Sequence, residues 1–197
     1  MYDEQTLSFY AEEASTYAAM PPAAERGELS NFLNQLTREG LILELGCGSG
    51  YDATLMLARG FSVDPTDGSP EMARQAEARL GRPVRVLPFD QLDARGEYDG
   101  VWASACLLHV PRPALSSVLA RVHAALVPGG LFFASYKEGS GEGRDGLGRY
   151  YNYPSAVELE AIYRAAADWG SLQIERRDGS GYDRKPTSWL SAWAWKA

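Results

Sequence analysis

The stretch LILELGCGSGYDATLMLARGFSVDPTDGSPEM, residues 41–72, predicts a strand, a glycine turn, a helix, a second strand and an acidic turn. Leu41–Leu45 is an apolar run broken only by Glu44, which is typical of a parallel strand covered on both faces. A helix over 51–59 follows, and a strand from Phe61 leads to an aspartate roughly 20 residues past the first glycine. In a parallel α/β sheet, a nucleoside-bearing ligand binds at this place, over the carboxyl ends of the first two strands.

The glycine turn separates two classes of nucleoside-binding protein. Dinucleotide-binding folds carry G-x-G-x-x-G and place a pyrophosphate on the helix N-terminus. Here the pattern is G-x-G-x-G, at Gly46, Gly48 and Gly50, and the carboxylate of Glu44 precedes it inside the strand. That carboxylate would repel a pyrophosphate but suits a ligand with an ammonium group. A nucleotide-dependent oxidoreductase is therefore disfavoured, and a glycine-rich turn of some other α/β protein is the alternative.

Two separate motifs carry a family resemblance. E-L-G-C-G-S-G at 44–50, coupled to T-D-G-S-P-E-M downstream, resembles the first motif of the class I S-adenosylmethionine methyltransferases. L-V-P-G-G-L-F-F at 126–133 is similar to the family's L-x-P-G-G-x-L turn. The resemblance spans 41–135 well and the flanks loosely, and it looks closest to small bacterial enzymes grouped with tellurite-resistance methyltransferases. It implies an α/β fold with a Rossmann-like, doubly wound, seven-stranded, mostly parallel sheet, an antiparallel last strand and helices on both faces.

The rest of the chain is expected to complete that sheet and its covering helices. Strands are expected at 84–87, 98–103 and 131–135, helices over 113–126 and 155–164, and a final hairpin around 172–174 and 189–195.

The resemblance also implies S-adenosylmethionine as cofactor and assigns residues to it. Glycine backbone lets the methionine part approach closely, and Glu44 acts on its amino end. Asp67 would accept hydrogen bonds from the ribose hydroxyls, with Asp64 as a rival because a proline between them could end the strand early. Met72 lies near the adenine or belongs to the core, and Asp90 binds the adenine amine or caps a turn. The predicted cofactor contacts are Tyr17, Glu44, Gly46, Cys47, Gly48, Gly50, Asp67, Gly68, Ser69, Met72, Phe89, Asp90, Gln91, Ala103 and Ser104.

Acceptor contacts are expected on the flanking segments. Cap helices are predicted within residues 1–40, over 3–19 and 24–38, and a glycine-rich lid loop over 136–154. The alternatives are that the tyrosines of the first helix pack it onto the sheet and that the loop is only solvated. The predicted acceptor-binding residues are Tyr10, Tyr136, Arg149 and Tyr151.

His109 is the candidate catalytic residue. It follows the strand predicted over 98–103, where the resemblance places the transferred methyl group, and an imidazole titrates near neutral pH. A base at that rim would take the acceptor's proton. The alternative is a structural histidine that hydrogen bonds a loop carbonyl. Cys47 and Cys106 are expected to be neighbouring buried thiols, and no metal site is predicted.

Composition limits the class of protein and its partners. A length of 197 residues fits one domain, 1–197. A net charge of -7 argues against a nucleic-acid partner, whose phosphates call for a basic surface. No apolar run approaches the roughly 20 residues of a membrane span, and the acidic N-terminus lacks the features of a signal peptide. Two cysteines form no disulfide framework, so a cytoplasmic location is expected.

We therefore expect an enzyme that methylates a small-molecule acceptor and acts as a monomer or homodimer without a membrane partner. The acceptor is expected to be small because the chain carries little beyond the core fold. No N-P-P-Y-type tetrapeptide follows the strand at 98–103, which disfavours planar nitrogens and leaves oxygen, sulfur, carbon and metalloid acceptors open. The alternative function is a non-catalytic S-adenosylmethionine sensor or partner subunit, which would bind the cofactor without turnover.

Overall fold

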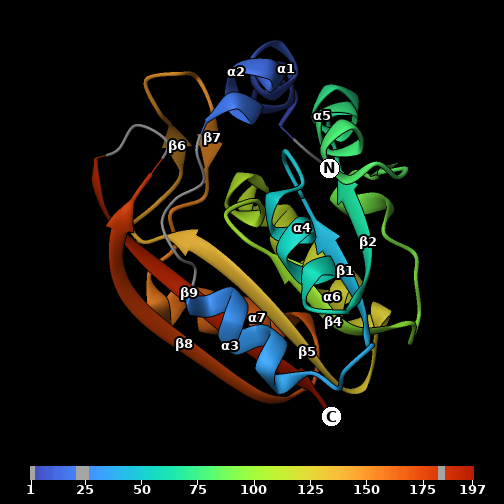
Figure 1. The fold of residues 1–197 in the computed structure, drawn as a ribbon. Coiled ribbons are helices and arrows are strands. Elements are labelled where there is room, and N and C mark those ends of the chain that lie inside the picture. The colour runs from blue at the N-terminus through green and yellow to red at the C-terminus, as the bar shows by residue number, and fades with distance from the viewer. Residues whose placement is uncertain (1–2, 21–26, 182–184) are drawn as a thin grey trace.

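The computed structural model describes residues 3–20, 27–181 and 185–197 (Figure 1). The elements in chain order, with η for a single 3-10 turn, are α1 (Glu4–Glu12), α2 (Ala14–Ala19), α3 (Gly27–Gln35), β1 (Leu41–Leu45), α4 (Tyr51–Ala58), β2 (Ser62–Asp67), α5 (Pro70–Leu80), β3 (Arg85–Val86), η1 (Phe89–Gln91), β4 (Tyr98–Ala103), η2 (Leu107–His109), α6 (Arg112–Ala125), β5 (Leu126–Lys137), β6 (Gly143–Arg144), β7 (Tyr150–Tyr151), α7 (Ala156–Ala166), β8 (Trp169–Ser180) and β9 (Pro186–Lys196).

One seven-stranded sheet organises the chain, with strand order β3-β2-β1-β4-β5-β9-β8. The pairs from β3 to β5 are parallel, and β9 runs antiparallel to both of its neighbours, β5 and β8. The predicted fold class is confirmed, including the antiparallel last strand. The strand order reverses between β1 and β4, and ligands of open α/β sheets bind outside the carboxyl ends of the strands at such a reversal.

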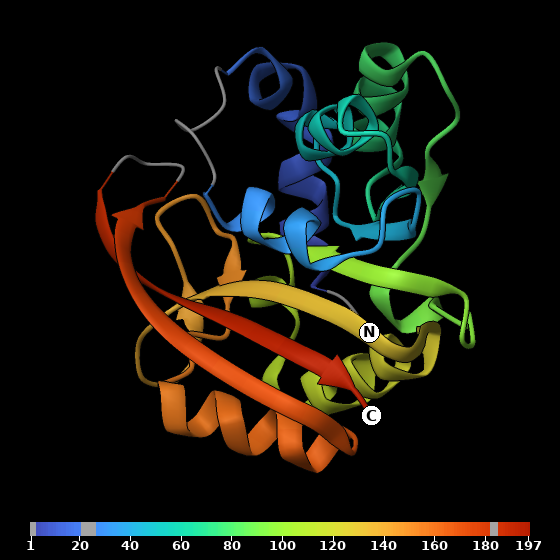
Figure 2. The ribbon, with the colours of Figure 1, turned by 60° about the horizontal axis from the view of Figure 1, so that its bottom comes forward.

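Helices cover both faces of the sheet, and each face has its own apolar core (Figure 2). On one face, α3 and α4 pack on Trp102, whose ring stacks on Phe133 with centroids 4.2 Å apart. On the other face, α6 and α7 pack on Leu43 and Phe132. Burial on both faces explains why the central strands are almost continuously apolar.

Strand β2 continues through Pro65 to Asp67, so the proline does not end it early. Thr66 O accepts from Cys47 N–H on the β1 side, and Asp67 O accepts from Leu87 N–H on the β3 side. Because backbone groups alternate along a strand, the nitrogen of Pro65 faces β3, whose pairing with β2 begins only at Thr66. The missing donor therefore falls where no ladder partner is required.

Several boundaries differ from the sequence predictions. The single helix expected over 3–19 is two helices, because the backbone at Glu13 leaves helical geometry (φ -93°, ψ 6°). Of the helix expected over 24–38, residues 24–26 lie outside the described part and α3 covers Gly27–Gln35. Strand β5 begins at Leu126 instead of residue 131, because the glycine turn lies within it as an irregularity in its pairing with β4.

The glycine-rich stretch predicted as a loop over 136–154 contains structure of its own. Its strands β6 and β7 form a two-stranded antiparallel hairpin. Figure 1 shows this hairpin beside α1 and α2, above the carboxyl ends of the parallel strands. Across the described residues, no helix combines the length and apolarity needed to cross a membrane.

Candidate functional site

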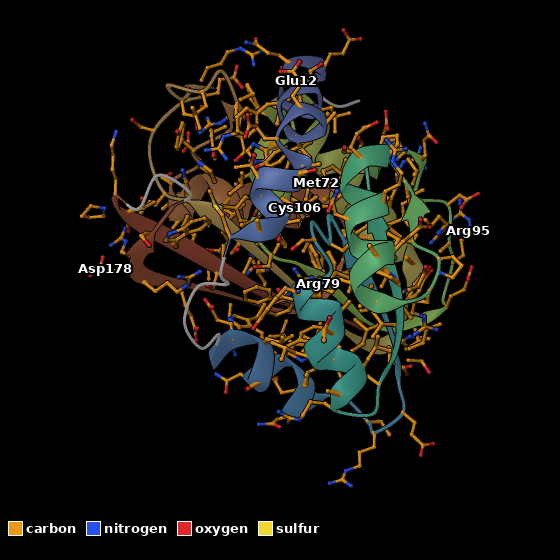
Figure 3. The ribbon with its side chains drawn as sticks, turned by 45° about the horizontal axis from the view of Figure 1, so that its top comes forward. Glu12, Met72, Arg79, Arg95, Cys106 and Asp178 are labelled. Carbon is orange, nitrogen blue, oxygen red and sulfur yellow. The ribbon has the colours of Figure 1, made fainter. Side chains whose placement is uncertain are left out.

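A cleft of about 100 Å³ lies beneath α1 and α2, at the carboxyl ends of the central strands. Figure 3 shows Met72 and Cys106 below these two helices. The cleft is lined by Thr6, Leu7, Tyr10, Tyr17, Gly46, Gly48, Asp67, Gly68, Met72, Pro88, Phe89, Ser104, Ala105, Cys106 and His109. It therefore brings together the glycine turn, the acidic turn, the segment after β4 and the first helix.

The glycine turn after β1 forms one wall of the cleft. Gly46 has φ +62°, and a Cβ there would lie 2.6 Å from Cys106 Cβ. Gly48 has φ +58°, and a Cβ there would meet Tyr17 Cε1 at 3.6 Å, on the cleft side. Only glycine combines this backbone geometry with the absence of a side chain, so the turn is an exposed backbone cradle. Gly50 does not line the cleft and is instead the N-cap of α4.

Asp67, at the end of β2, joins the two turns. Its carboxylate accepts hydrogen bonds from Gly48 N–H at 2.9 Å and from Ser69 N–H at 2.8 Å. Burial raises the pKa of Asp67 to about 6, although these bonds work in the opposite direction. The rival Asp64 points elsewhere, because it accepts from Arg85 and from the Tyr98 hydroxyl, each at 2.6 Å. The structure thus places Asp67, and not Asp64, in the cleft.

Glu44 lies deeper than the sequence suggested. It is buried in β1 beneath the glycine turn and does not line the cleft. Burial, with the negative charges of Glu44 and Asp67, raises the pKa of the Cys47 thiol far above its usual value. Cys47 and Cys106 are both buried, and their thiols lie close enough that Cys106 contributes to the raised pKa of Cys47. Both therefore remain protonated thiols, and Cys106 Sγ donates to Leu45 O at 3.0 Å.

The predicted adenine contacts divide into two groups. Phe89 and Met72 line the cleft, as does Ser104 after β4. Asp90 lies in η1 outside the cleft lining, and Gln91 is exposed. Other predicted contacts lie just behind the wall, namely Cys47, Ser69, which caps α5, and Ala103, the last residue of β4.

At the other end of the cleft, Tyr10 and His109 form a hydrogen-bonded pair. The Tyr10 hydroxyl lies 3.0 Å from His109 Nε2, and His109 Nδ1 lies 2.6 Å from Tyr150 O. A carbonyl oxygen only accepts, so Nδ1 carries the proton and Nε2 accepts from Tyr10. Burial lowers the pKa of His109 to about 4, and the imidazole is therefore neutral at neutral pH.

Arg149 lies behind Tyr10 and not in the cleft. Its buried guanidinium pairs with Asp145 at 2.7 Å and donates to the Tyr10 hydroxyl at 3.2 Å. It also lies over the rings of Phe9 and Tyr10, at 5.0 and 5.9 Å from their centroids. A positive charge and the imidazole of His109 therefore both contact the tyrosine oxygen.

The remaining predicted acceptor contacts are also buried outside the cleft. Tyr136 belongs to the core, where its hydroxyl lies 3.1 Å from that of Tyr163. Tyr151 is buried against His109, with ring centroids 4.6 Å apart. Of the predicted acceptor-binding residues, Tyr10 alone appears among the described side chains that line the cleft.

Sequence analysis missed Thr6, Leu7 and Pro88 as cleft residues, and it treated Cys106 only as a buried thiol. Leu7 precedes Tyr10 by one helical turn, so helical spacing from Tyr10 was a usable signal. Ala105 has φ +53° and its N–H donates to Ser135 Oγ at 2.9 Å. A positive φ at alanine is sterically costly, and nothing local in the sequence indicates it.

Comparisons with known proteins agree with this geometry. Residues 42–130 match a family model described as a methyltransferase domain. An uncharacterized methyltransferase of Synechocystis sp. is 31% identical over 97 residues, which cover 46% of this chain and 44% of that protein. A ubiquinone biosynthesis O-methyltransferase of Pseudomonas aeruginosa is 34% identical over 101 residues, covering 48% of this chain and 43% of that protein. The chain spans less than half the length of these two relatives.

Solved structures extend the likeness to almost the whole chain. Burkholderia thailandensis 1,6-didemethyltoxoflavin-N1-methyltransferase, solved with 1,6-didemethyltoxoflavin and S-adenosylhomocysteine, is 26% identical with a TM-score of 0.78, covering 98% of this chain and 88% of that chain. A SAM-dependent methyltransferase of Methanosarcina mazei shares the fold at 18% identity with a TM-score of 0.74, covering 88% of this chain and 99% of that chain. Residues 42–130 are therefore a methyltransferase domain, and the chain has the fold of the S-adenosylmethionine-dependent methyltransferases, which supports S-adenosylmethionine as its cofactor.

Proposed function

We propose that this protein transfers a methyl group from S-adenosylmethionine to a small-molecule acceptor between Asp67 and the Tyr10–His109 pair. The observation that carries the proposal is that one cleft joins a buried carboxylate on a glycine cradle to a neutral imidazole. When bound, the cofactor supplies an electrophilic methyl group and departs as S-adenosylhomocysteine. The relatives support a small acceptor, since the Burkholderia enzyme was solved with one.

The residues of the cleft fit the cofactor. The backbone at Gly46 and Gly48 offers the close approach that the methionine part needs, and the ionised carboxylate of Asp67 can accept from ribose hydroxyls. Phe89 and Met72 provide apolar contacts for a purine. A ligand pocket of this kind measures roughly 300 Å³ or more. Because the cleft measures about 100 Å³, it has to widen when the cofactor enters.

The Tyr10–His109 pair can take up the proton that a protic acceptor loses. As the acceptor's lone pair forms its bond to the methyl carbon, its proton passes to the Tyr10 oxygen and the tyrosine proton passes to His109 Nε2. The Arg149 guanidinium stabilises negative charge on the tyrosine oxygen during this shift. The proposal therefore favours acceptors with a hydroxyl or a thiol. An N–H group is included because the similar Burkholderia enzyme is an N1-methyltransferase, although the missing N-P-P-Y-type tetrapeptide disfavours planar nitrogens.

Four further sequence predictions remain part of the proposal. Residues 1–197 act as one domain, with its cap in 1–40. The protein acts in the cytoplasm, as a monomer or homodimer. Residues 136–154 close over the acceptor as a lid. The hydrogen bond from Tyr150 N–H to Thr6 Oγ1 supports the closing role, because it ties the hairpin to the helix that covers the cleft. Limited proteolysis with and without S-adenosylhomocysteine tests it. Equal cutting of 136–154 in both states would count against a lid.

The looser likeness to tellurite-resistance enzymes stays a prediction.

Calorimetric titration with S-adenosylmethionine tests the cofactor site, using Asp67→Asn and the matched control Asp64→Asn on the same strand. The wild type is expected to bind at micromolar concentration, near typical cofactor levels. Asp67→Asn should weaken binding at least tenfold, about 1.4 kcal/mol, and Asp64→Asn should stay within about twofold. Equal affinity of both variants would remove Asp67 from the site.

A second measurement separates the enzyme from a non-catalytic sensor. Turnover is followed as S-adenosylhomocysteine formed over a broad panel of phenols, thiols and N–H heterocycles. Formation of methylated product supports the proposal. Tight cofactor binding without turnover on any member of the panel would favour the sensor.

A further inference from the structure

His109 stands at the end of η2, a single turn of three residues. The turn is closed by His109 N–H donating to Cys106 O at 3.0 Å and by Val110 N–H donating to Leu107 O at 3.1 Å. A 3-10 turn this short has weak hydrogen-bond geometry and does not hold its own orientation. The direction of the His109 ring must therefore be set by contacts from other parts of the chain.

The side chain of Asn152 makes such contacts, from 42 to 45 residues further along the chain. Its Nδ2 donates to Leu107 O at 3.0 Å and to Val110 O at 3.1 Å, on either side of His109. Its backbone N–H donates to Leu108 O at 2.9 Å. The residue is fully buried, so these bonds are shielded from water and costly to break.

The segment that carries Asn152 is itself held at both ends. On one side, Tyr150 N–H donates to Thr6 Oγ1 at 2.8 Å, and Tyr150 O accepts from His109 Nδ1. On the other side, Arg112 Nε donates to Asn152 O at 2.9 Å. Residues 150–152 therefore connect α1, η2 and the start of α6, and they contact His109 through both its backbone turn and its ring.

We propose that Asn152 is a positioning residue: its carboxamide fixes the 107–110 turn so that His109 Nε2 faces Tyr10 at the cleft. The inference rests on the proposed function, because the position of Nε2 affects turnover only if His109 takes up the acceptor's proton. The side chain of Asn152 is buried behind the turn and does not line the cleft. Its action on the acceptor is therefore indirect.

The chain offers a clean readout, because it contains only two histidines, His109 and His123. Two-dimensional ¹H–¹⁵N spectra of the imidazole rings, recorded across a pH titration, report the tautomer and the pKa of each ring. In the wild type, His109 should show one neutral tautomer with its proton on Nδ1 and a midpoint near 4. The charged side chains that act on this ring are Arg149, Lys137 and Asp145, and the variants below keep all of them.

Asn152→Ala should release the turn, so that a second tautomer of His109 appears and its midpoint rises by about one pH unit or more as burial is relieved. The signals of His123, on α6, should not move. Asn152→Leu has nearly the same size, lacks the pair of N–H donors and adds no charge near His109, and it should show the same change if the alanine variant fails to fold. Folded variants that keep the wild-type tautomer and midpoint would overturn the inference.

Tyr163→Phe is the matched control, since it deletes a buried hydroxyl that pairs with Tyr136 instead of with η2. It should leave the His109 signals as in the wild type. A change as large as that of Asn152→Ala would mean that any loosening of the core alters the His109 signals, and it would overturn the inference. With a turned-over acceptor, Asn152→Ala should lower kcat at least tenfold and leave S-adenosylmethionine affinity within twofold. If His109 responds as expected but His109→Gln keeps full turnover, the positioning role stands and the proposed proton transfer fails.

Discussion

The two sides of the cleft are built in different ways. The cofactor side consists mainly of the turns after β1 and β2, whose residues lie within the contiguous stretch 41–72, and Phe89 of η1 adds to it. The acceptor side consists of α1, η2 and the β6–β7 hairpin, and it is held by bonds between residues far apart in sequence. Tyr10 and His109 are 99 positions apart, and Thr6 and Tyr150 are 144 positions apart.

The kind of contact differs as well. On the cofactor side, backbone conformation and backbone N–H groups form the surface, with one carboxylate at its centre. On the acceptor side, side chains bond to one another and bury an ion pair. The matched methyltransferase segment, 42–130, includes the cofactor side and η2 but neither α1 nor the hairpin. In the proposed function, recognition of the acceptor therefore depends in part on segments that lie outside the family match.

Replacing the buried Arg149 should cause the largest loss of stability. The substitution tests whether the acceptor side depends on the pairing of side chains. Arg149→Met leaves Asp145 without its partner, and breaking such a pair costs about 3 kcal/mol of unfolding free energy. Chemical denaturation would measure it. Arg144→Met is the control, because the arginine side chain of the Arg144–Asp3 pair is 42% exposed, whereas that of Arg149 is 2% exposed, and its loss should cost less. Equal effects would mean that burial does not distinguish the two pairs.

The cofactor side is tested by adding one methyl group at either of two glycines with positive φ. Gly46→Ala and Gly60→Ala share the cost of the left-handed backbone, but only the first meets Cys106 Cβ, at 2.6 Å. Crowding should make Gly46→Ala less stable than Gly60→Ala by about 2 kcal/mol. It should also weaken S-adenosylmethionine binding, which Gly60→Ala should not. Equal denaturation midpoints for the two variants would show that the turn at Gly46 accommodates the added methyl group without a loss of stability.

The two sides carry groups that titrate at different pH, Asp67 on the cofactor side and His109 on the acceptor side. The pH dependence of cofactor affinity should therefore follow Asp67 alone. With the pKa of Asp67 near 6, protonation at pH 5 should weaken binding roughly tenfold relative to pH 7, about 1.4 kcal/mol. His109, with its pKa near 4, stays neutral over that range. Calorimetry at both pH values would measure the ratio, and Asp67→Asn should abolish it. A ratio that persists in that variant would point to another group.

The same carboxyl should affect stability with the opposite sign. Its folded pKa lies above the ordinary 3.8, so its contribution to stability is present below about pH 4 and is lost as pH rises through 6. Protonation of Asp67 at low pH should therefore raise the free energy of unfolding of the unliganded protein, while it weakens cofactor binding. Comparing the pH dependence of unfolding in wild type and Asp67→Asn checks the sign.

The smallest effect is expected at Ser135, whose hydroxyl accepts from the N–H of Ala105, a residue that lines the cleft. Ser135→Ala removes the acceptor for Ala105 N–H and should cost about 1 kcal/mol. Adding Ala105→Gly should recover part of the loss, since glycine adopts φ +53° without strain. Thermal unfolding of the two single variants and the double variant measures the coupling. Strict additivity of the two changes would show that Ser135 does not hold the strained backbone.

Local signals in the sequence predicted most of the fold and the cofactor side. The apolar run at β1, the glycine spacing and Asp67 each act over a few residues, so their geometry follows from backbone conformation. The predictions were less accurate where a local pattern was compatible with two different structures. Pro65 suggested an early end to β2, but its missing donor faces a place without a ladder partner. Arg149 was predicted to contact the acceptor, but its pairing with Asp145 turns it behind Tyr10.

The sequence by itself determined the α/β sheet, the glycine cradle and the carboxylate that faces it, because helical and strand periodicity and left-handed backbone are encoded residue by residue. Only the tertiary structure decided which tautomer His109 adopts, which of the predicted tyrosines reach the cleft, and that a hairpin far along the chain holds the turn beside it. Such contacts depend on closing long loops and burying polar groups together, and no short pattern records that balance.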